Sequence, residues 1–295
     1  MKDQFLDYLA LERNYSPQTV KSYREDLEKF EAYFKNLEGN ALTWEMIDSD
    51  VIRNWMESMM DRGNTATSIN RRLSALRSFY RFALSRRLVK SDPAHAVAGP
   101  KRKKPLPMFL KEQEMDRLLE PEMWTDDYQD SLARTILILF YETGIRLSEL
   151  VGLDVKAVDF VSKELKVTGK RNKQRVIPFG DELAETLNDY LDKRNRIFLV
   201  DEEALFVSEK GRRMTQQNVR LLVQKHLSRV TTMKKRSPHV LRHTFATVML
   251  NHEAGLESVK KLLGHESLAT TEIYTHTTFE QLKKVYQNAH PRAEQ

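Results

Sequence analysis

Apolar residues recur every three or four positions through the first ninety residues, the spacing that places them on one face of a helix. Ser16 suits an N-cap and Pro17 suits a first helical position. The run that begins there carries apolar side chains at Val20, Tyr23, Leu27, Phe30 and Phe34. This pattern predicts a bundle of helices for residues 1–90.

A further amphipathic helix is predicted from Thr67 or Ser68 to about Leu88. One face of this helix is apolar, with Ile69, Leu73, Leu76, Tyr80 and Ala83. The other side is basic, with Arg71, Arg77 and Arg81. Such a helix can pack on its domain and present cations to DNA phosphates, although an ordinary surface helix would show the same pattern.

Residues 91–107 break the periodicity with four prolines, and they predict a linker between two domains. The linker contains a basic run of four residues, Lys101, Arg102, Lys103 and Lys104. A basic, extended linker could let two domains close around a duplex, so we expect these four side chains to contact DNA. A nuclear-localisation run is a weaker alternative.

From residue 108 the pattern mixes helix and strand. Helices are predicted at residues 112–119, 131–141 and 147–153, and residues 158–178 alternate and turn as a small antiparallel sheet does. Helical spacing returns after Gly180, with a short strand expected at 204–207 and a last helix at 278–288. The predicted fold is mainly α with a small antiparallel β-sheet. Its two domains are a helical bundle, 1–90, and an α+β domain, 108–295.

Charge is segregated along the 295 residues, although the net charge is only +6. Residues 1–61 carry seven Lys and Arg against thirteen Asp and Glu. Residues 62–104 carry twelve basic residues against one acid, and residues 210–236 carry nine against none. A single basic stretch is more often a solvated face, but two of them are typical of a protein that binds a polyanion.

The composition argues against several other classes. The chain has no cysteine, which excludes disulfides and cysteine metal sites and fits a reducing cytoplasm. Its first residues show no secretory signal, and its longest apolar run, 136–141, is too short to cross a membrane. Because the sequence has no His-Glu-x-x-His, no compact set of Asp residues and no Walker loop, we expect no metal, nucleotide or other cofactor.

Four segments carry polar residues suited to chemistry on a phosphodiester: 143–150, 167–173, 239–243 and 263–274. Each alone is a weak signal, but their order and spacing closely resemble the tyrosine recombinase (phage-integrase-like) family. That family has an Arg in a Thr-Gly-x-Arg turn, a Lys on a β-hairpin, a His-x-x-Arg, a His after Leu-Gly and a Tyr nine residues beyond it. The resemblance covers nearly the whole chain and is nearest to the Xer branch.

The resemblance implies a catalytic domain of tyrosine recombinase type with six catalytic residues, which are Arg146, Lys170, His239, Arg242, His265 and Tyr274. The residue types fit the reaction. Two arginines can donate hydrogen bonds to the non-bridging phosphate oxygens, and a phenol can form a reversible phosphate ester. The resemblance makes the lysine the general acid for the leaving 5′ oxygen, and the second histidine a ligand of the scissile phosphate.

Other roles near these residues stay open. His239 shares a helix face with Arg242 and could bond a phosphate oxygen or help remove the tyrosine proton. Glu149, one turn past Arg146, could buttress an active-site side chain, and a plain surface glutamate is as good an interpretation. The remaining cations of the hairpin, Arg171, Lys173 and Arg175, are left as neighbours that could contact phosphates.

The family implies cleavage and rejoining of double-stranded DNA through a 3′-phosphotyrosine intermediate. It also implies a homo- or hetero-tetramer on DNA, linked by the C-terminal helix, although this helix could instead dock on its own domain. Whether a second recombinase or a DNA translocase takes part stays open. The Xer branch resolves chromosome dimers. Two alternatives remain, an integrase of a mobile element and a non-catalytic architectural DNA binder.

Overall fold

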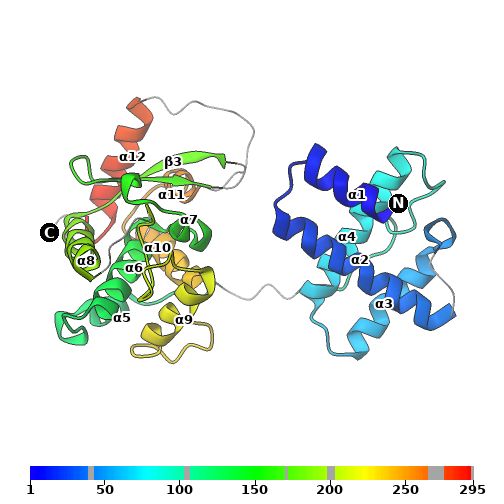
Figure 1. The fold of residues 1–295 in the computed structure, drawn as a ribbon, viewed down its shortest axis with the longest axis horizontal. Helices are drawn as coiled ribbons and strands as arrows, with labels where there is room; N and C mark the ends of the chain where they lie inside the picture. The colour runs from blue at the N-terminus through cyan, green and yellow to red at the C-terminus, as the bar shows by residue number, and fades with distance from the viewer. Residues whose placement is uncertain (39–42, 103–106, 170–171, 198–202, 265–275, 294–295) are drawn as a thin grey trace. The chain divides into compact units, whose positions relative to one another are not determined.

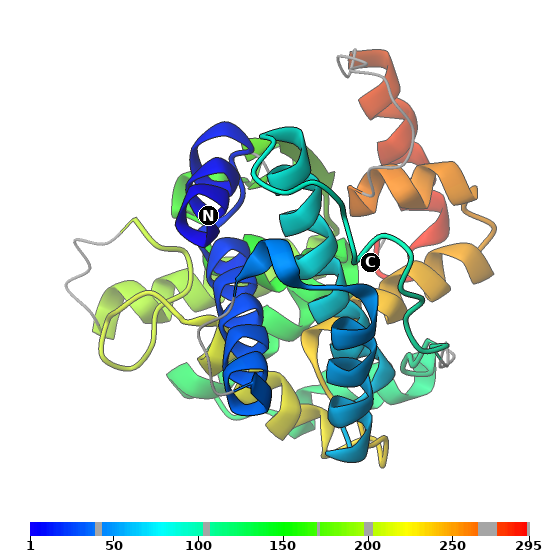
Figure 2. The same cartoon turned by 90° about the vertical axis from the view of Figure 1, so that its right-hand side faces the viewer.

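The computed structural model describes residues 1–38, 43–102, 107–169, 172–197, 203–264 and 276–293, with only the backbone described for 276–281. The chain separates into two compact units, Met1–Pro105 and Leu106–Gln295. Figure 1 and Figure 2 show the helices and strands of both units. Both units are mainly helical and the second contains a small antiparallel sheet, which confirms the predicted fold class.

The N-terminal unit consists of helices joined by short turns. Its elements are α1 (Lys2–Asp7), the π-helical turn η1 (Tyr8–Glu12), α2 (Pro17–Glu38), the 3-10 turn η2 (Trp44–Met46), α3 (Ser49–Asp61) and α4 (Ala66–Ser85). The Ser16 hydroxyl accepts the Thr19 N–H at 3.3 Å, as expected of the N-cap of α2. Helix α4 begins earlier than predicted, because Thr65 is its N-cap. It also ends earlier, where Arg87 adopts a left-handed conformation with φ of 56°.

Aromatic rings fill the core of this unit. The Trp44 ring lies 4.4 Å from that of Phe79 and 6.1 Å from that of Tyr80, measured between centroids. The Phe5 ring of α1 meets Phe79 edge-on at 5.5 Å. Since all four side chains are buried, this cluster fixes α4 against α1 and the turn before α3.

Residues 93–100, inside the segment predicted as a linker, pack on the N-terminal unit. Arg77 of α4 donates from Nε to the Ala94 carbonyl at 3.2 Å and from Nη2 to the Val97 carbonyl at 2.5 Å. Ala94 and Val97 are buried in the same core as the aromatic cluster. Arg77 therefore holds part of the chain that follows α4, a role that its sequence position did not predict.

The C-terminal unit combines helices with a three-stranded sheet of order β1-β2-β3. Its elements are α5 (Glu112–Leu119), η3 (Pro121–Met123), α6 (Tyr128–Thr143), α7 (Leu147–Val151), η4 (Val155–Ala157), β1 (Val158–Asp159), β2 (Glu164–Thr168), β3 (Gln174–Pro178), α8 (Asp181–Ile197), α9 (Gln216–Leu227), α10 (Pro238–Asn251), α11 (Leu256–Leu263) and α12 (His276–Ala289). The strand predicted at 204–207 is wrong, because this segment makes only two isolated bridges, Asp154 to Ala204 and Val207 to Arg213.

Helix α6 runs through the core of the unit and contacts α8, α9 and α10. Its apolar residues from Ile136 to Tyr141 are buried, which explains the long apolar run in the sequence. The helix ends at Gly144, whose φ of 56° is left-handed. A Cβ on Gly144 would lie 2.5 Å from Phe245 and 2.7 Å from Leu263, so α10 and α11 pack directly on this turn.

The C-terminal helix α12 packs on α10 and α11 of its own unit. Leu282, Tyr286 and Ala289 are buried there, and the Tyr286 hydroxyl donates to the Glu142 carboxylate at 3.1 Å. The buried ring of His290 lies 3.2 Å, through Nε2, from the Tyr141 carbonyl oxygen. The residues from α12 to His290 thus pack on α6, the core helix.

Candidate active site

Arg146 occupies the turn between α6 and α7, where the sequence motif Thr-Gly-x-Arg predicts a catalytic arginine. Its guanidinium donates to Glu149 Oε1 at 2.8 Å and to the Gly264 carbonyl at 2.6 Å. Its backbone N–H donates to Glu149 Oε2 at 2.9 Å, which caps the start of α7. The side chain is 34% exposed, so Arg146 is held firmly while part of its guanidinium still faces water.

Arg242 of α10 lies beside Arg146 and is 8% exposed. It donates to the Gly144 carbonyl at 2.5 Å and to the Leu263 carbonyl at 2.7 Å. Burial, followed by the charges of Arg146 and Arg175, lowers the pKa of Arg242 to about 9. The guanidinium therefore stays charged at neutral pH.

His239 precedes Arg242 by one turn of α10 and is exposed. Partial desolvation, followed by the charges of His243 and Arg242, lowers the pKa of His239. Its imidazole is therefore neutral at neutral pH, and one ring nitrogen can accept a proton. The structure thus brings three of the six predicted catalytic residues, Arg146, Arg242 and His239, onto adjacent elements.

The carbonyl groups at the end of α11 are bound by three arginines. Arg175 Nε donates to Leu262 at 3.0 Å, whereas the Leu263 and Gly264 carbonyls receive Arg242 and Arg146. A helix C-terminus leaves such carbonyls without intrahelical partners and carries partial negative charge, so cations are favoured there. Gly264 ends the helix with a left-handed φ of 63°. The chain enters the predicted catalytic segment directly from this anchored end.

Arg175 and Glu149 are also part of the site. The sequence placed Arg175 only near the catalytic residues and left the role of Glu149 undecided. Arg175 donates from Nη1 and Nη2 to the two oxygens of Glu149, at 2.6 and 2.9 Å. The Glu149 side chain is 1% exposed and that of Arg175 is 10% exposed. One sequence signal could have found Arg175: it shares a strand face with Ile177, where an apolar residue is expected.

The other predicted catalytic residues, Lys170, His265 and Tyr274, lie outside the described residues, as do Lys103 and Lys104. Their described neighbours border the arginine cluster. A Cβ on Gly169 would lie 3.1 Å from Glu149 Oε1, and the Gly264 carbonyl accepts from Arg146. The chain therefore enters both segments next to Arg146.

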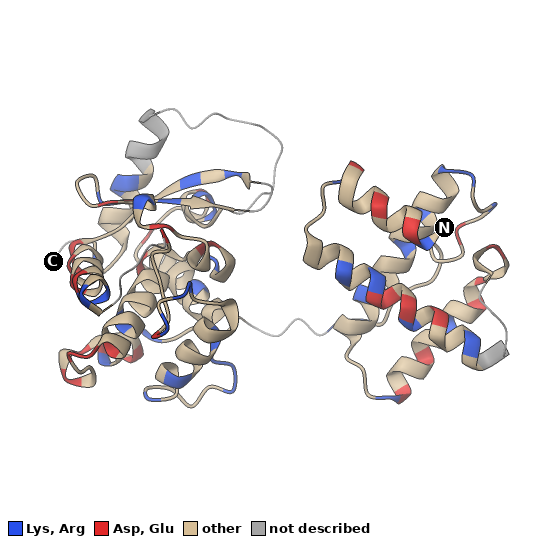
Figure 3. Ribbon diagram, in the orientation of Figure 1, with Lys and Arg blue, Asp and Glu red and all other residues tan. Residues whose placement is uncertain are grey.

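The predicted DNA contacts of α4 fall into two classes. Arg71 and Arg81 are exposed, and so are Lys101 and Arg102, whereas Arg77 is bound to backbone carbonyls. Arg71 also pairs with the buried carboxylate of Asp26, at 2.8 Å from Nη2. Figure 3 shows the basic residues on α4 and, in the other unit, around α9 and on the sheet.

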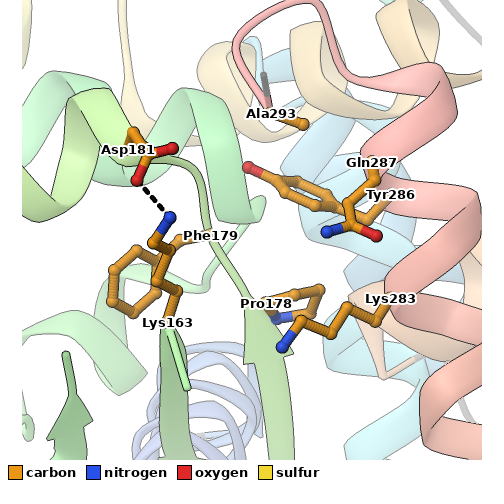
Figure 4. Close-up of a pocket in the computed structure, with 8 residues that line it drawn as sticks. All are labelled: Lys163, Pro178, Phe179, Asp181, Lys283, Tyr286, Gln287 and Ala293. Atoms are coloured by element: carbon orange, nitrogen blue, oxygen red, sulfur yellow. Dashed lines mark ion pairs between the residues drawn. The ribbon is translucent and has the colours of Figure 1, made fainter. Parts of the chain in front are cut away.

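A pocket of about 350 Å³ lies away from the arginine cluster, between the end of β3, the start of α8 and α12 (Figure 4). Lys163 and Asp181 form an ion pair at its rim, and Lys283 of α12 donates to the Ser162 carbonyl at 2.9 Å. Among the residues that the structure describes, no three His, Cys, Asp or Glu side chains gather as a metal site requires. Within the same ranges, no helix is long and apolar enough to cross a membrane.

Comparison with known proteins matches both units to one group of families. Residues 108–281 match the Phage integrase family, and residues 3–87 match the Phage integrase, N-terminal SAM-like domain. The chain is 39% identical over 303 residues to the tyrosine recombinase XerC of Pelotomaculum thermopropionicum, covering 99% of this chain and 98% of that protein. It is 39% identical over 293 residues to XerC of Staphylococcus carnosus, with the same coverage.

Solved structures with the same fold include two recombinases. The crystal structure of XerA recombinase is 28% identical and covers 99% of this chain and 98% of its own, with a TM-score of 0.50. XerH site-specific recombinase, in a post-cleavage complex with a palindromic difH substrate, is 22% identical. It has a TM-score of 0.72 over 97% of this chain and 84% of its own.

Proposed function

Because the chain belongs to the phage integrase family and is a tyrosine site-specific recombinase, we propose that it resolves chromosome dimers through a phosphotyrosine intermediate on Tyr274. The two relatives named above, which match almost the whole chain, are both XerC recombinases. The observation that carries the proposal is the pair of guanidinium groups, Arg146 and Arg242, on adjacent carbonyls at the end of α11. Its place of action would be the cytoplasm, where a bacterial chromosome lies.

In the proposed cleavage step, the phenolic oxygen of Tyr274 attacks the phosphorus and the bond to the 5′ oxygen breaks. Lys170 gives its proton to that oxygen, which leaves as a 5′ hydroxyl. The phosphate remains esterified to the DNA 3′ oxygen and to the tyrosine. A 5′ hydroxyl from the partner strand then attacks this ester and releases the tyrosine. Each step exchanges one P–O bond for another, so the proposed exchange uses neither ATP nor a metal.

The described residues have matching roles in this step. Arg146 and Arg242 would bind the non-bridging oxygens, whose negative charge grows in the five-coordinate transition state. A guanidinium has five N–H donors, more than Arg146 uses in its contacts with the Glu149 carboxylate and the Gly264 carbonyl among the described residues. His239, which is neutral at neutral pH, would accept the tyrosine proton, and His265 would orient the phosphate.

DNA binding would depend on cations outside the site as well. The exposed Arg71 and Arg81 on α4, with the run from Lys101 to Lys104, would contact phosphates. Affinity should therefore fall steeply with salt, because each phosphate contact releases counterions. Arg77 is not included, since its guanidinium is bound to the Ala94 and Val97 carbonyls.

The active assembly would be a homo- or hetero-tetramer on DNA, linked by C-terminal helices, with a second recombinase and a translocase as partners. Helix α12 packs on a docking surface of its own unit, where Leu282 and Tyr286 are buried. Every protomer has the same docking surface, so the α12 helix of a neighbouring protomer could bind there if the helices exchanged. A pocket of about 350 Å³ lies beside α12 (Figure 4). Deleting residues from Thr278 onward should abolish cooperative assembly and retain single-site binding.

A covalent trapping experiment tests the chemistry. Purified protein is incubated with a nicked duplex that carries a candidate site from its own genome, without divalent metal. We expect a denaturation-resistant protein–DNA complex that is lost in Tyr274→Phe. A complex that persists in this variant would show that another residue is the nucleophile. Tight binding without any complex in the wild type would favour an architectural DNA binder.

A genetic experiment tests the biological role. Chromosome dimers arise when homologous recombination joins two sister circles, so a dimer resolvase is needed only where that pathway is active. Deleting the gene should give filamentous cells with unsegregated chromosomes, and removing homologous recombination should restore normal division. A mobile-element integrase would show neither effect, and its loss would instead stop excision of one element.

A further inference from the structure

The end of α11 is held by arginines from three different elements, and one of them is not among the proposed catalytic residues. Arg242 comes from α10, Arg146 from the turn before α7, and Arg175 from β3. Each binds a different carbonyl of the last turn. Two of these cations, Arg146 and Arg175, also donate to a single carboxylate, Glu149.

Two arginines bind the Glu149 carboxylate, and Arg175 is less exposed than Arg146. Its two terminal nitrogens bind the Glu149 oxygens and its Nε binds Leu262, so all three nitrogens have partners. Only 10% of the side chain is exposed, against 34% for Arg146. A planar guanidinium can satisfy a carboxylate and a backbone carbonyl together, and an ammonium group cannot reproduce this geometry.

We infer that Arg175 is a positioning residue, which fixes the turn of Arg146, the hairpin of Lys170 and the end of α11 in one arrangement. The inference rests on the proposed function, since it takes the roles of these catalytic residues from there. Arg175 reaches the turn of Arg146 through Glu149, belongs itself to the strand that closes the hairpin, and binds the helix end that leads into His265. One side chain thus connects three segments that are far apart in the sequence.

Two glycines make room for this arrangement. A Cβ on Gly264 would lie 3.2 Å from the Arg175 side chain, and a Cβ on Gly169 would lie 3.1 Å from Glu149 Oε1. Both separations are shorter than ordinary contacts between non-bonded heavy atoms. The glycine before Lys170 and the glycine before His265 therefore both border the Arg175–Glu149 pair, which gives these two motif positions a common physical reason.

The charges favour the same role. Burial acts to raise the pKa of Glu149, but the hydrogen bonds and charge of Arg175, and then those of Arg146, bring it below its usual value. Without Arg175 the carboxylate would keep one arginine partner, and the end of α11 would lose one of its three cations. Arg146 would then be held by a less fixed partner, while its own contact with Gly264 would remain.

The test compares Arg175→Gln and Arg175→Lys with wild type in the full-length protein, on the nicked duplex used for trapping. We expect the cleavage rate at saturating protein to fall by about 10²-fold in both variants, because small displacements of catalytic groups have effects of this order. The dissociation constant for DNA and its dependence on salt should stay unchanged. Tyr274→Phe is measured alongside, so a failure of this inference leaves the proposed nucleophile standing.

Arg213→Gln is the matched control for a merely structural arginine. Arg213 also binds a carboxylate, Asp154 at 2.6 Å, and two backbone carbonyls, Val151 and Leu153 at 3.1 and 2.9 Å. Removing it should lower thermal stability and leave the cleavage rate of the folded protein unchanged. If Arg175→Gln lowered the rate no more than Arg213→Gln does, the inference would be wrong.

A double-mutant cycle identifies the route through Glu149. If Arg175 acts on Arg146 through this carboxylate, Arg175→Gln combined with Glu149→Gln should lose no more activity than the worse single variant. If Arg175 contacts the DNA phosphate itself, the two losses should multiply, and DNA affinity should fall in Arg175→Gln. Either of these last results would overturn the positioning role.

Discussion

The two units each bury a carboxylate against arginine, with opposite electrostatic results. Burial raises the pKa of Asp26 in the N-terminal unit, and Arg71 only partly offsets this effect. In the C-terminal unit the arginines outweigh burial and lower the pKa of Glu149. Arg71 is 45% exposed, whereas Arg175 is 10% exposed. Glu149 also accepts hydrogen bonds from the Arg146 guanidinium and backbone N–H, whereas the described hydrogen bonds to Asp26 all come from Arg71. More donors to the charged form, one of them well shielded, lower the pKa further.

A third buried carboxylate extends the comparison. Glu142 is fully buried, and it accepts the Gly180 N–H at 2.8 Å and the Tyr286 hydroxyl at 3.1 Å. No arginine hydrogen bond to it occurs among the described residues, and burial raises its pKa to about 8. Within the part of the chain that the structure describes, the three sites thus form a series of two, one and no arginines that donate hydrogen bonds to the carboxyl group, at Glu149, Asp26 and Glu142, and only at Glu149 is the pKa lowered.

The largest effect is expected when the charge of Glu149 is removed. Glu149→Gln leaves Arg175 buried without its counter-ion, which should lower the free energy of unfolding by about 3–5 kcal/mol. The cleavage rate of the folded protein should fall by about 10²-fold, because Arg146 loses its fixed partner. Denaturant unfolding and trapping kinetics measure the two effects. An equal loss of cleavage rate in Asp26→Asn would remove the distinction between the units.

A second prediction sorts the arginines of α4. Arg77→Gln should lower the free energy of unfolding by about 1–3 kcal/mol, because it leaves the Ala94 and Val97 carbonyls without their donor. Arg81→Gln should not change stability. It should instead weaken DNA binding and reduce the slope of log affinity against log salt by about 1. Reversed results in thermal melts and salt titrations would exchange the two roles.

A third prediction uses the pH dependence of Glu142. Since its pKa in the folded protein lies near 8, above the usual 4.5, its contribution to stability is complete below pH 4.5 and is lost as pH rises through about 8. Glu142→Gln cannot ionise, so it should melt above wild type at about pH 6 and further above it at about pH 9, where its advantage in the free energy of unfolding grows by roughly 2–3 kcal/mol, because the unfolded chain ionises Glu142 from about pH 4.5 upward. Parallel melting curves at both pH values would contradict this.

The smallest expected effect concerns Asp26. Asp26→Asn releases Arg71 from its ion pair and adds one positive charge to the basic face, so DNA should bind a few-fold more tightly at low salt. The slope against salt should steepen by up to about 1. Arg71→Gln is the matched control, and it should change affinity in the opposite direction. An unchanged slope in both variants would mean that Arg71 does not face DNA.

Much of this architecture could be predicted from local patterns. The start of α2 at Pro17 and the bounds of α5 follow from capping and periodicity, and the sheet follows from alternation around a turn. The sequence motifs also predicted Arg146, Arg242 and His239, which the structure brings together. These features depend on residues close in the sequence or on a combination that rarely occurs by chance.

The contacts that escaped prediction join distant residues. Arg77 looked like a DNA contact because its helix is amphipathic, yet it binds carbonyls seventeen and twenty positions away. Arg175 looked like a neighbour because it lies past the hairpin lysine, yet its partners are Glu149 and Leu262. The periodicity of a sequence does not show which distant residue the end of a long side chain will contact in the fold.

The arginine contacts at the end of α11 also bear on how such a site can change over evolutionary time. Their acceptors are main-chain carbonyls, which every amino acid supplies. A substitution at Leu262 or Leu263 would remove a side chain and leave the acceptor in place, so it would demand no compensating change in the arginine. Contacts of this kind leave no paired signature between positions. Methods that infer proximity from correlated substitutions will therefore miss these three contacts, although they could still detect the side-chain pairs of Glu149 with Arg146 and Arg175.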